Sequence, residues 1–278
     1  MESFKPEPEQ EKGLSSELES EKKEYNFGAI AKLEKPIIEL AEKLREKIEN
    51  GEYDTLISDD VGGRIPTLIL RKIMLSKAKD DQFKKRLKTF FIAGGKGRHE
   101  DEKELGDFIK GVSEISNKVL LVTEYIETGK AIKEIMRLFE NYGLKSFDVA
   151  SVAVNLEFVA DPTAAGFSEF LSSFKKNSRE FFYGEIVDEV PPIYRWGASA
   201  GGVKKKTKEH FEKREIHGAH PIRMEDLALQ VYHAQQRYKT SKEVSRIKEI
   251  RKEIREDIKG AREDVEVLSQ KVIEQVWK

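Results

Sequence analysis

The chain has 278 residues with 50 Lys and Arg against 51 Asp and Glu, and its formal net charge is -1. That balance argues against a uniformly basic nucleic-acid-binding protein. The absence of cysteine excludes disulfides, thiolate metal ligands and cysteine nucleophiles. No apolar run is long enough to span a bilayer and no secretory signal pattern is present, so we expect a cytoplasmic protein.

Composition divides the chain into three segments. Residues 1–24 are rich in Glu, Lys, Ser and Pro and poor in apolar residues, which predicts a disordered charged tail. Residues 25–203 carry the strand and helix patterns of an α/β domain. Residues 204–278 begin with three consecutive lysines and predict a charged linker followed by C-terminal helices.

Helical and strand patterns alternate through the first half of the α/β segment. Pro36 suits the first position of a helix, and Asn50-Gly51 supplies its end. The predicted strands and the helices between them are Thr55–Ser58, Pro66–Leu75, Thr89–Ala93, Val119–Val122, Ala131–Tyr142 and Phe147–Val154. This alternation predicts a parallel sheet with right-handed crossovers.

The pattern weakens after Asn155 and becomes helical again towards the C-terminus. Phe181–Tyr183 is the next candidate strand, and helical spacing resumes at Met224. Thr240 and Glu243 form a capping-box pattern, so we expect two helices to meet there. The second helix has an apolar stripe that must be buried against the domain or against another chain: Ile247, Ile250, Ile254, Ile258, Ala261, Val265, Leu268, Val272 and Val276.

The stretch Val119–Ile132, with the sequence VLLVTEYIETGKAI, carries most of the functional information. An apolar run ends in polar residues and a glycine turn, which predicts a buried parallel strand leading into a helix. Ligands of open α/β sheets bind at the carboxyl ends of the strands. A helix N-terminus there offers free N–H groups to a phosphate, from residues Thr128, Gly129, Lys130 and Ala131.

The segment from Pro36 to Val154 resembles the type I phosphoribosyltransferases, and its loop is most similar to the hypoxanthine-guanine branch. In that branch an apolar strand is followed by two acids, two apolar residues and Asp-Thr-Gly-Lys-Thr. The corresponding residues here are Thr123-Glu124, Tyr125-Ile126 and Glu127-Thr128-Gly129-Lys130-Ala131. The resemblance implies a parallel-sheet phosphoribosyltransferase-like α/β domain with a C-terminal helical extension. It also implies transfer of a phosphoribosyl group from phosphoribosyl diphosphate, with Mg²⁺, to a purine-like nucleobase.

The resemblance further implies a role for each matching residue. The turn Thr128–Ala131 would hold the ribose phosphate, and Glu124 with Thr123 would face the ribose hydroxyls and the metal. Glu127 would lie beside the incoming base, as general base or as a stabiliser of positive charge. Two more segments match the family's diphosphate-binding loop and its mobile lid: Gly62, Gly63 and Arg64 for the loop, and Gly95–Lys110 for the lid.

Several residues depart from the family pattern and support other hypotheses. Thr123 replaces an acid, Ala131 replaces a hydroxyl, and Asp59-Asp60 would repel diphosphate unless Mg²⁺ bridges them or they point away. A second hypothesis is therefore a non-catalytic nucleotide-binding sensor or regulator that signals through the C-terminal helices. A third is an interaction protein that forms a homo-oligomer through those helices. A generic doubly wound domain is the simplest alternative to the family fold.

Three other kinds of site are disfavoured by the sequence. The sequence does not match a Walker phosphate loop, because Glu124 and Ala131 occupy the positions where that motif requires a glycine and a hydroxyl residue. His210, His217 and His220 match no strong zinc-binding spacing and are interpreted as linker residues. The basic run at residues 204–206 is interpreted as a solvated linker rather than a nucleic-acid contact.

Overall fold

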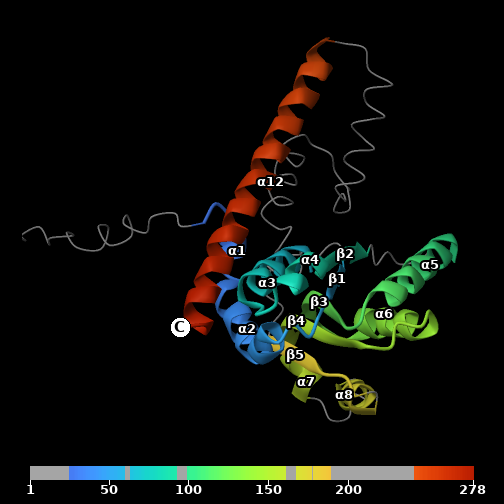
Figure 1. Ribbon diagram of the computed structural model, residues 1–278. Helices are drawn as coiled ribbons and strands as arrows, with labels where there is room; N and C mark the ends of the chain where they lie inside the picture. The colour runs from blue at the N-terminus through green and yellow to red at the C-terminus, as the bar shows by residue number, and fades with distance from the viewer. Residues whose placement is uncertain (1–24, 60–62, 93–98, 161–166, 177, 189–240) are drawn as a thin grey trace, which may run out of the picture.

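A five-stranded parallel sheet forms the centre of the computed structural model, in the order β2-β1-β3-β4-β5 (Figure 1). The structure describes residues 25–59, 63–92, 99–160, 167–176, 178–188 and 241–278. The strands are β1 (Thr55–Asp59), β2 (Lys88–Ile92), β3 (Val119–Ile126), β4 (Phe147–Asn155) and β5 (Phe181–Val187). The fold class predicted from the sequence, an α/β parallel sheet with a C-terminal helical extension, is confirmed.

The helices follow the predicted alternation, and the structure adds several short or charged helices that the sequence pattern did not predict. They are α1 (Gly28–Ala31), α2 (Glu34–Glu49), α3 (Arg64–Lys77), α4 (Asp81–Arg86), α5 (His99–Ile115), α6 (Lys130–Asn141), α7 (Leu156–Ala160), α8 (Phe167–Lys176) and α12 (Ser241–Val276). Gly51, just beyond α2, has φ 64° and Gly143, just beyond α6, has φ 86°, as expected of residues that end helices. The unpredicted helices α7 and α8 fill the stretch after Asn155.

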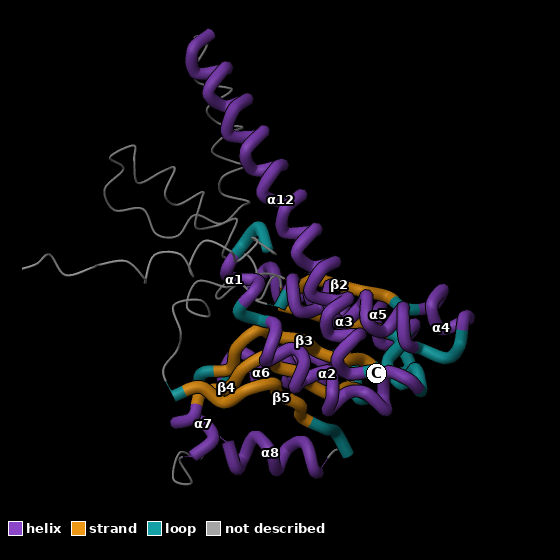
Figure 2. The backbone as a smooth tube through the Cα atoms, turned by 90° about the vertical axis from the view of Figure 1, so that its left-hand side faces the viewer, coloured by secondary structure: helices purple, strands orange, loops and turns teal. Residues whose placement is uncertain are grey.

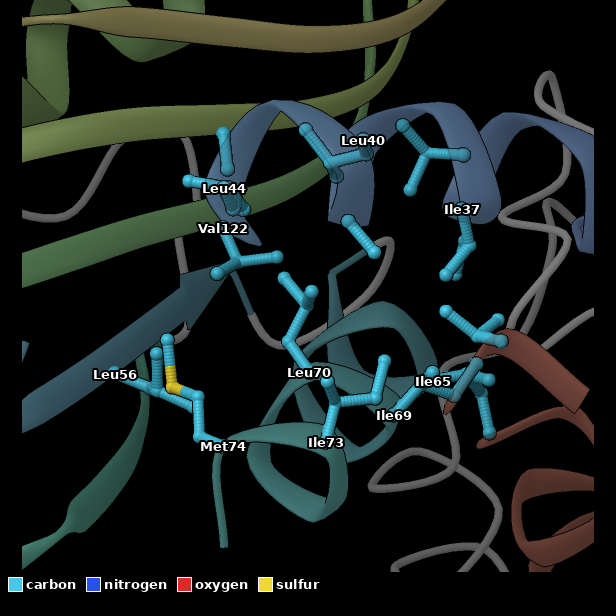
Figure 3. Close-up of a cluster of buried hydrophobic side chains, with 14 of the residues drawn as sticks. Ile37, Leu40, Leu44, Leu56, Ile65, Ile69, Leu70, Ile73, Met74 and Val122 are labelled. Carbon is cyan, nitrogen blue, oxygen red and sulfur yellow. The ribbon is translucent and has the colours of Figure 1, made fainter. Parts of the chain in front are cut away.

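Two hydrophobic clusters lie on opposite faces of the sheet. One joins the sheet to α2 and α3, and Figure 3 shows Leu56 and Val122 meeting side chains of these helices, such as Leu44 and Leu70. The other joins the sheet to α5, α6, α7 and α8. Because both faces are covered, the central strands are almost continuously apolar, which is why their sequences do not alternate.

The segment Gly95–Lys110, which matches the position of the family's lid, is largely helical, so the polar loop expected there is wrong. Residues 95–98 lie outside the described part of the chain, and α5 begins at His99. The helix forms because its apolar residues recur at helical spacing and pack on the sheet and α6: Leu105, Phe108, Ile109 and Val112. The many charged residues between them conceal this stripe in the sequence.

The C-terminal half of α12 packs against α2 and α3 of the same chain. Its buried apolar residues are the predicted stripe positions Ala261, Val265, Leu268, Val272 and Val276. The N-terminal half extends away from the sheet in both views, and its Lys252 and Arg255 are exposed (Figures 1 and 2). The apolar stripe of α12 is therefore buried within its own chain over the C-terminal half of the helix. The first of the two predicted C-terminal helices and the boundary at residues 203–204 lie in 189–240, outside the described residues.

A buried carboxylate fixes the point where α12 meets the start of the domain. Asp264 is 1% exposed, and its two oxygens accept hydrogen bonds from the backbone N–H groups of Asn26 and Phe27, each at 2.8 Å. The ring of Phe27 lies so close to Gly260 that a Cβ there would come within 3.2 Å of it. These contacts make α12 part of the fold rather than a separate appendage.

A polar network closes the amino-terminal edge of the sheet. The Tyr53 hydroxyl donates to Asp148 at 2.7 Å, and Lys118 pairs with the same carboxylate at 2.9 Å. Burial, followed by the charge of Asp148 and the hydrogen bond to it, raises the pKa of Tyr53 well above its ordinary value of 10.0. This network lies at the opposite end of the sheet from the predicted site, so we assign it to stability. Among the described helices, none is both long and apolar enough to cross a membrane.

Candidate functional site

The candidate site lies where the strand order of the sheet reverses. From β1 the chain crosses to β2 on one side, whereas β3, β4 and β5 follow on the other side. Such a switch point leaves a crevice outside the carboxyl ends of the two strands, and ligands of doubly wound proteins bind there. The β1–α3 and β3–α6 loops leave these neighbouring strands, so the topology brings the two predicted phosphate-contacting loops to the same edge.

Thr123 and Glu124 lie inside β3 rather than in the loop after it, because the strand continues to Ile126. Thr123 is paired with Ser151 of β4. The side chains of Thr123 and Glu124 are 3% and 2% exposed, respectively. The prediction ended the strand at Val122 because the polar residues looked like the start of a loop. In the structure they extend the central strand to the edge where the site lies.

The turn between β3 and α6 presents a left-handed glycine and the free N–H groups of a helix start. Glu127 and Thr128 are exposed, and Gly129 adopts φ 70° in the left-handed region. Helix α6 starts at Lys130, and its first bond to the turn runs from the N–H of Lys133 to the carbonyl of Gly129 at 2.9 Å. Gly129 is the N-cap residue of α6, and as a glycine it has no side chain that could accept from the first helix N–H groups. The three N–H groups before Lys133 are therefore the orphan donors of this helix.

The chemistry at this helix start suits an anion. The first turn of α6 contains no acidic residue, and the side chains of Lys130 and Ala131 are exposed. The helix dipole adds partial positive charge at the same place. Thr128 can add one hydroxyl donor to the backbone amides. Glu127 is the negative group nearest in sequence to the turn, and it precedes the donors rather than lying among them.

Gly129 cannot be replaced by another residue without disturbing the loop. Its φ lies in a region that L side chains rarely adopt. A Cβ on Gly129 would also lie 2.7 Å from Cζ and 3.0 Å from Cε2 of Phe158 on α7. The glycine that the sequence identified is thus required both by the turn and by its packing.

The predicted diphosphate loop is described from Gly63 onward. Gly63 precedes α3, with φ -81°, and its carbonyl accepts from the N–H of Thr67 at 2.9 Å. Arg64 is exposed, and its guanidinium carbon lies 4.9 Å from the centre of the Phe91 ring on β2. Arg64 therefore lies on the β2 side of the switch point. Gly62 and Asp60 lie outside the described residues.

The sequence interpretation missed two residues, Asn155 at the end of β4 and Phe158 in α7. Asn155 accepts a hydrogen bond from the N–H of Glu157 at 2.6 Å and so starts α7. Phe158 of that helix then reaches the glycine turn. The available signal was an Asn two residues before an acid, which is typical of an Asx turn or helix cap.

No group of three or more His, Asp or Glu residues that could hold a metal ion occurs among the described residues. The three linker histidines at 210, 217 and 220 fall outside the described part of the chain.

Comparison with known proteins gives limited information. No protein-family model matches this chain, and no curated protein matches it. Among solved structures, the chain is similar to a crystal structure of a purine phosphoribosyltransferase from Pyrococcus horikoshii Ot3, with 18% sequence identity and a TM-score of 0.31. The similarity covers 59% of this chain and 93% of that one. A TM-score of this size does not assign the chain to a family.

Proposed function

We propose that this protein binds the phosphate of a ribose phosphate at the β3–α6 turn. The observation that carries the proposal is the left-handed Gly129 turn at the sheet's switch point, with exposed Thr128 before it and uncapped amides after it. We further propose that the bound molecule is phosphoribosyl diphosphate and that its phosphoribosyl group is transferred to a purine-like nucleobase. The residue pattern of the loop supports this extension.

In this proposal the phosphate accepts hydrogen bonds from the amides of Lys130, Ala131 and Ile132 and from the Thr128 hydroxyl. Hydrogen bonds to a charged group typically contribute about 1.5–3 kcal/mol each. The rigid backbone supplies most of these donors, so replacing the family hydroxyl by Ala131 removes one contact and leaves the others.

The ribose and diphosphate would lie between the two loops. Glu124 would accept hydrogen bonds from the ribose hydroxyls beside Thr123, and both are almost fully buried, so the atoms that cover them must move aside on binding. Gly62, Gly63 and Arg64 would contact the diphosphate. When bound, Mg²⁺ would neutralise charge on that leaving group.

Glu127 is proposed as the catalytic residue. The bond between C1′ of the ribose and the diphosphate oxygen breaks, and a bond from C1′ to a nitrogen of the base forms. The proton on that nitrogen passes to the Glu127 carboxylate, or the carboxylate stabilises the positive charge until the proton leaves. The exposed position of Glu127, directly before the phosphate turn, supports this role.

The transfer is tested by incubating the protein with Mg²⁺, phosphoribosyl diphosphate and a panel of nucleobases while diphosphate release is followed. Base-dependent release supports the transferase, and no base-dependent release across the panel contradicts it. For the Glu127→Gln variant we expect kcat to fall about 100-fold or more, because general base catalysis typically contributes that much. Glu134→Gln, a matched change at an exposed position of α6, should leave kcat unchanged.

A non-catalytic sensor is the second candidate function. Thr123 stands in place of one acid of the ribose and metal site, and Ala131 lacks the last hydroxyl of the phosphate loop. Thr123 removes a charge that the transfer reaction would use, whereas the backbone amides that would hold a phosphate are unaffected by either change. Calorimetry that detects nucleotide binding in a protein without turnover would favour the sensor over the transferase.

A helical interaction protein is the third candidate. The C-terminal half of α12 is buried within its own chain, so self-association would have to use the projecting N-terminal half. Light scattering before and after removal of residues 241–258 tests this, and a monomer in both cases contradicts it. We place all three candidate functions in the cytoplasm, in keeping with the cysteine-free composition.

A further inference from the structure

Phe158 packs directly against the glycine of the proposed phosphate turn. Its ring occupies the space where a side chain at residue 129 would begin, with Cζ 2.7 Å and Cε2 3.0 Å from an ideal Cβ position. Phe158 itself is 6% exposed. The contact therefore joins α7 to the turn between β3 and α6, two segments that are distant in sequence.

A glycine turn needs such support if its amides are to bind an anion tightly. Glycine has the most conformational freedom of any residue, and an unsupported Gly129 would sample φ values of both signs. Amides that must be ordered during binding contribute less affinity than amides already held in place. The packed Phe158 ring restricts the backbone of Gly129, and the buried strand β3 restricts the residues that enter the turn.

Phe158 is held in place by the rest of the structure. Ile126 at the end of β3 is paired with Val154 of β4, and Asn155 then caps the start of α7. The Phe158 ring contacts Phe170 edge-on, with 5.6 Å between centroids, and Phe170 is fully buried. Phe170 in turn contacts two more rings, Phe174 at 4.7 Å and Phe181 of β5 at 5.1 Å.

We propose that Phe158, supported by this aromatic stack, is a positioning residue that holds the phosphate-binding turn in its anion-binding conformation. The ligand in this proposal, a phosphate, rests on the proposed function, whereas the packing of Phe158 on Gly129 does not depend on it. Helices α7 and α8 then act as the support of the loop rather than as a connection between β4 and β5. Phe158 does not touch the reacting atoms, so it acts through Gly129.

The test compares Phe158→Ala and Phe158→Leu with Phe174→Leu. Phe174 is a matched control because it belongs to the same stack and is 2% exposed, yet it contacts Phe170 and Phe181 rather than the turn. Two measurements are made on each folded variant. One is amide hydrogen exchange of Lys133, whose N–H is bonded to the carbonyl of Gly129 at 2.9 Å, and the other is calorimetric binding of ribose 5-phosphate.

We expect Phe158→Ala to speed exchange of the Lys133 amide about tenfold relative to the amides of β4, because a supported turn opens less often than an unsupported one. Ribose 5-phosphate affinity should fall by about the same factor, since the amides must then be ordered on binding. Phe158→Leu should recover part of both effects. Phe174→Leu should lower the melting temperature without changing either measurement.

Equal effects of Phe158→Ala and Phe174→Leu on the turn would overturn the proposal, because they would show a merely structural role. An unchanged affinity despite faster exchange would overturn it as well. If the unmodified protein fails to bind ribose 5-phosphate, the proposed function fails, and the exchange measurement still decides whether Phe158 holds the turn.

Discussion

Replacing Leu268 by Ala tests whether α12 is an integral part of the fold. Leu268 is 0% exposed and lies in the cluster that joins α12 to α2 and α3. The substitution removes three buried carbon atoms, at about 0.8 kcal/mol per buried methylene, or about 2.4 kcal/mol in lost transfer free energy. The remaining cavity adds to this cost, so we expect the free energy of unfolding to fall by about 3 kcal/mol.

The change is measured by urea unfolding, with the midpoint and the slope fitted separately. In a chain of this size about 3 kcal/mol corresponds to a melting temperature lower by about 6–12 °C. Gln270→Ala, at an exposed position on the same turn of α12, is the control and should change stability by less than about 0.5 kcal/mol. A Leu268→Ala protein as stable as this control would refute the packing of α12 within one chain.

Two further predictions concern the stability of the α/β domain. Gly184→Ala should cost about 3 kcal/mol, because its Cβ would lie 2.1 Å from the carbonyl oxygen of Pro36 and 2.5 Å from that of Val152. Gly111→Ala in α5, where a Cβ would meet open space, should instead stabilise the protein by up to about 1 kcal/mol. Equal effects of the two substitutions on thermal unfolding would contradict the close approach of the backbone at Gly184. Because folding raises the pKa of Tyr53, the neutral Tyr53 hydroxyl stabilises the folded protein at pH values below 10.0, its ordinary pKa. This contribution to the free energy of unfolding is lost as the pH rises above 10.0. The free energy of unfolding, measured with urea across pH 9–11, should therefore fall less steeply with pH for Tyr53→Phe than for the unmodified protein. Equal slopes for the two proteins would contradict this prediction.

The sequence was sufficient to predict the parallel sheet because its strands and helices have different periodicities. Buried runs such as Val119–Val122 are continuously apolar, whereas helices such as α6 show a stripe at helical spacing. The glycine turn at Gly129 was identified because a glycine between a buried apolar run and an amphipathic helix is typical of a strand-to-helix turn. Its left-handed φ agrees with that interpretation.

The rest depended on contacts between distant residues, which local patterns do not contain. The sequence could not show that Thr123 and Glu124 continue β3, because polar residues at the end of a strand look like the start of a loop. It also gave no indication that Phe158 packs on Gly129, since that contact depends on where α7 turns after β4. The stripe of α12 was visible, but only the packed structure distinguishes burial within one chain from burial against another.

The central claim is that the Gly129 turn binds the phosphate of a ribose phosphate, and titration calorimetry with ribose 5-phosphate and phosphoribosyl diphosphate tests it most directly. We expect saturable binding of both ligands, stronger for phosphoribosyl diphosphate when Mg²⁺ is present. Thr128→Val should weaken binding about tenfold or more by removing a hydrogen bond to a charged group, whereas Glu134→Gln should not. Absence of binding, or equal binding by the Thr128→Val protein, would contradict the account.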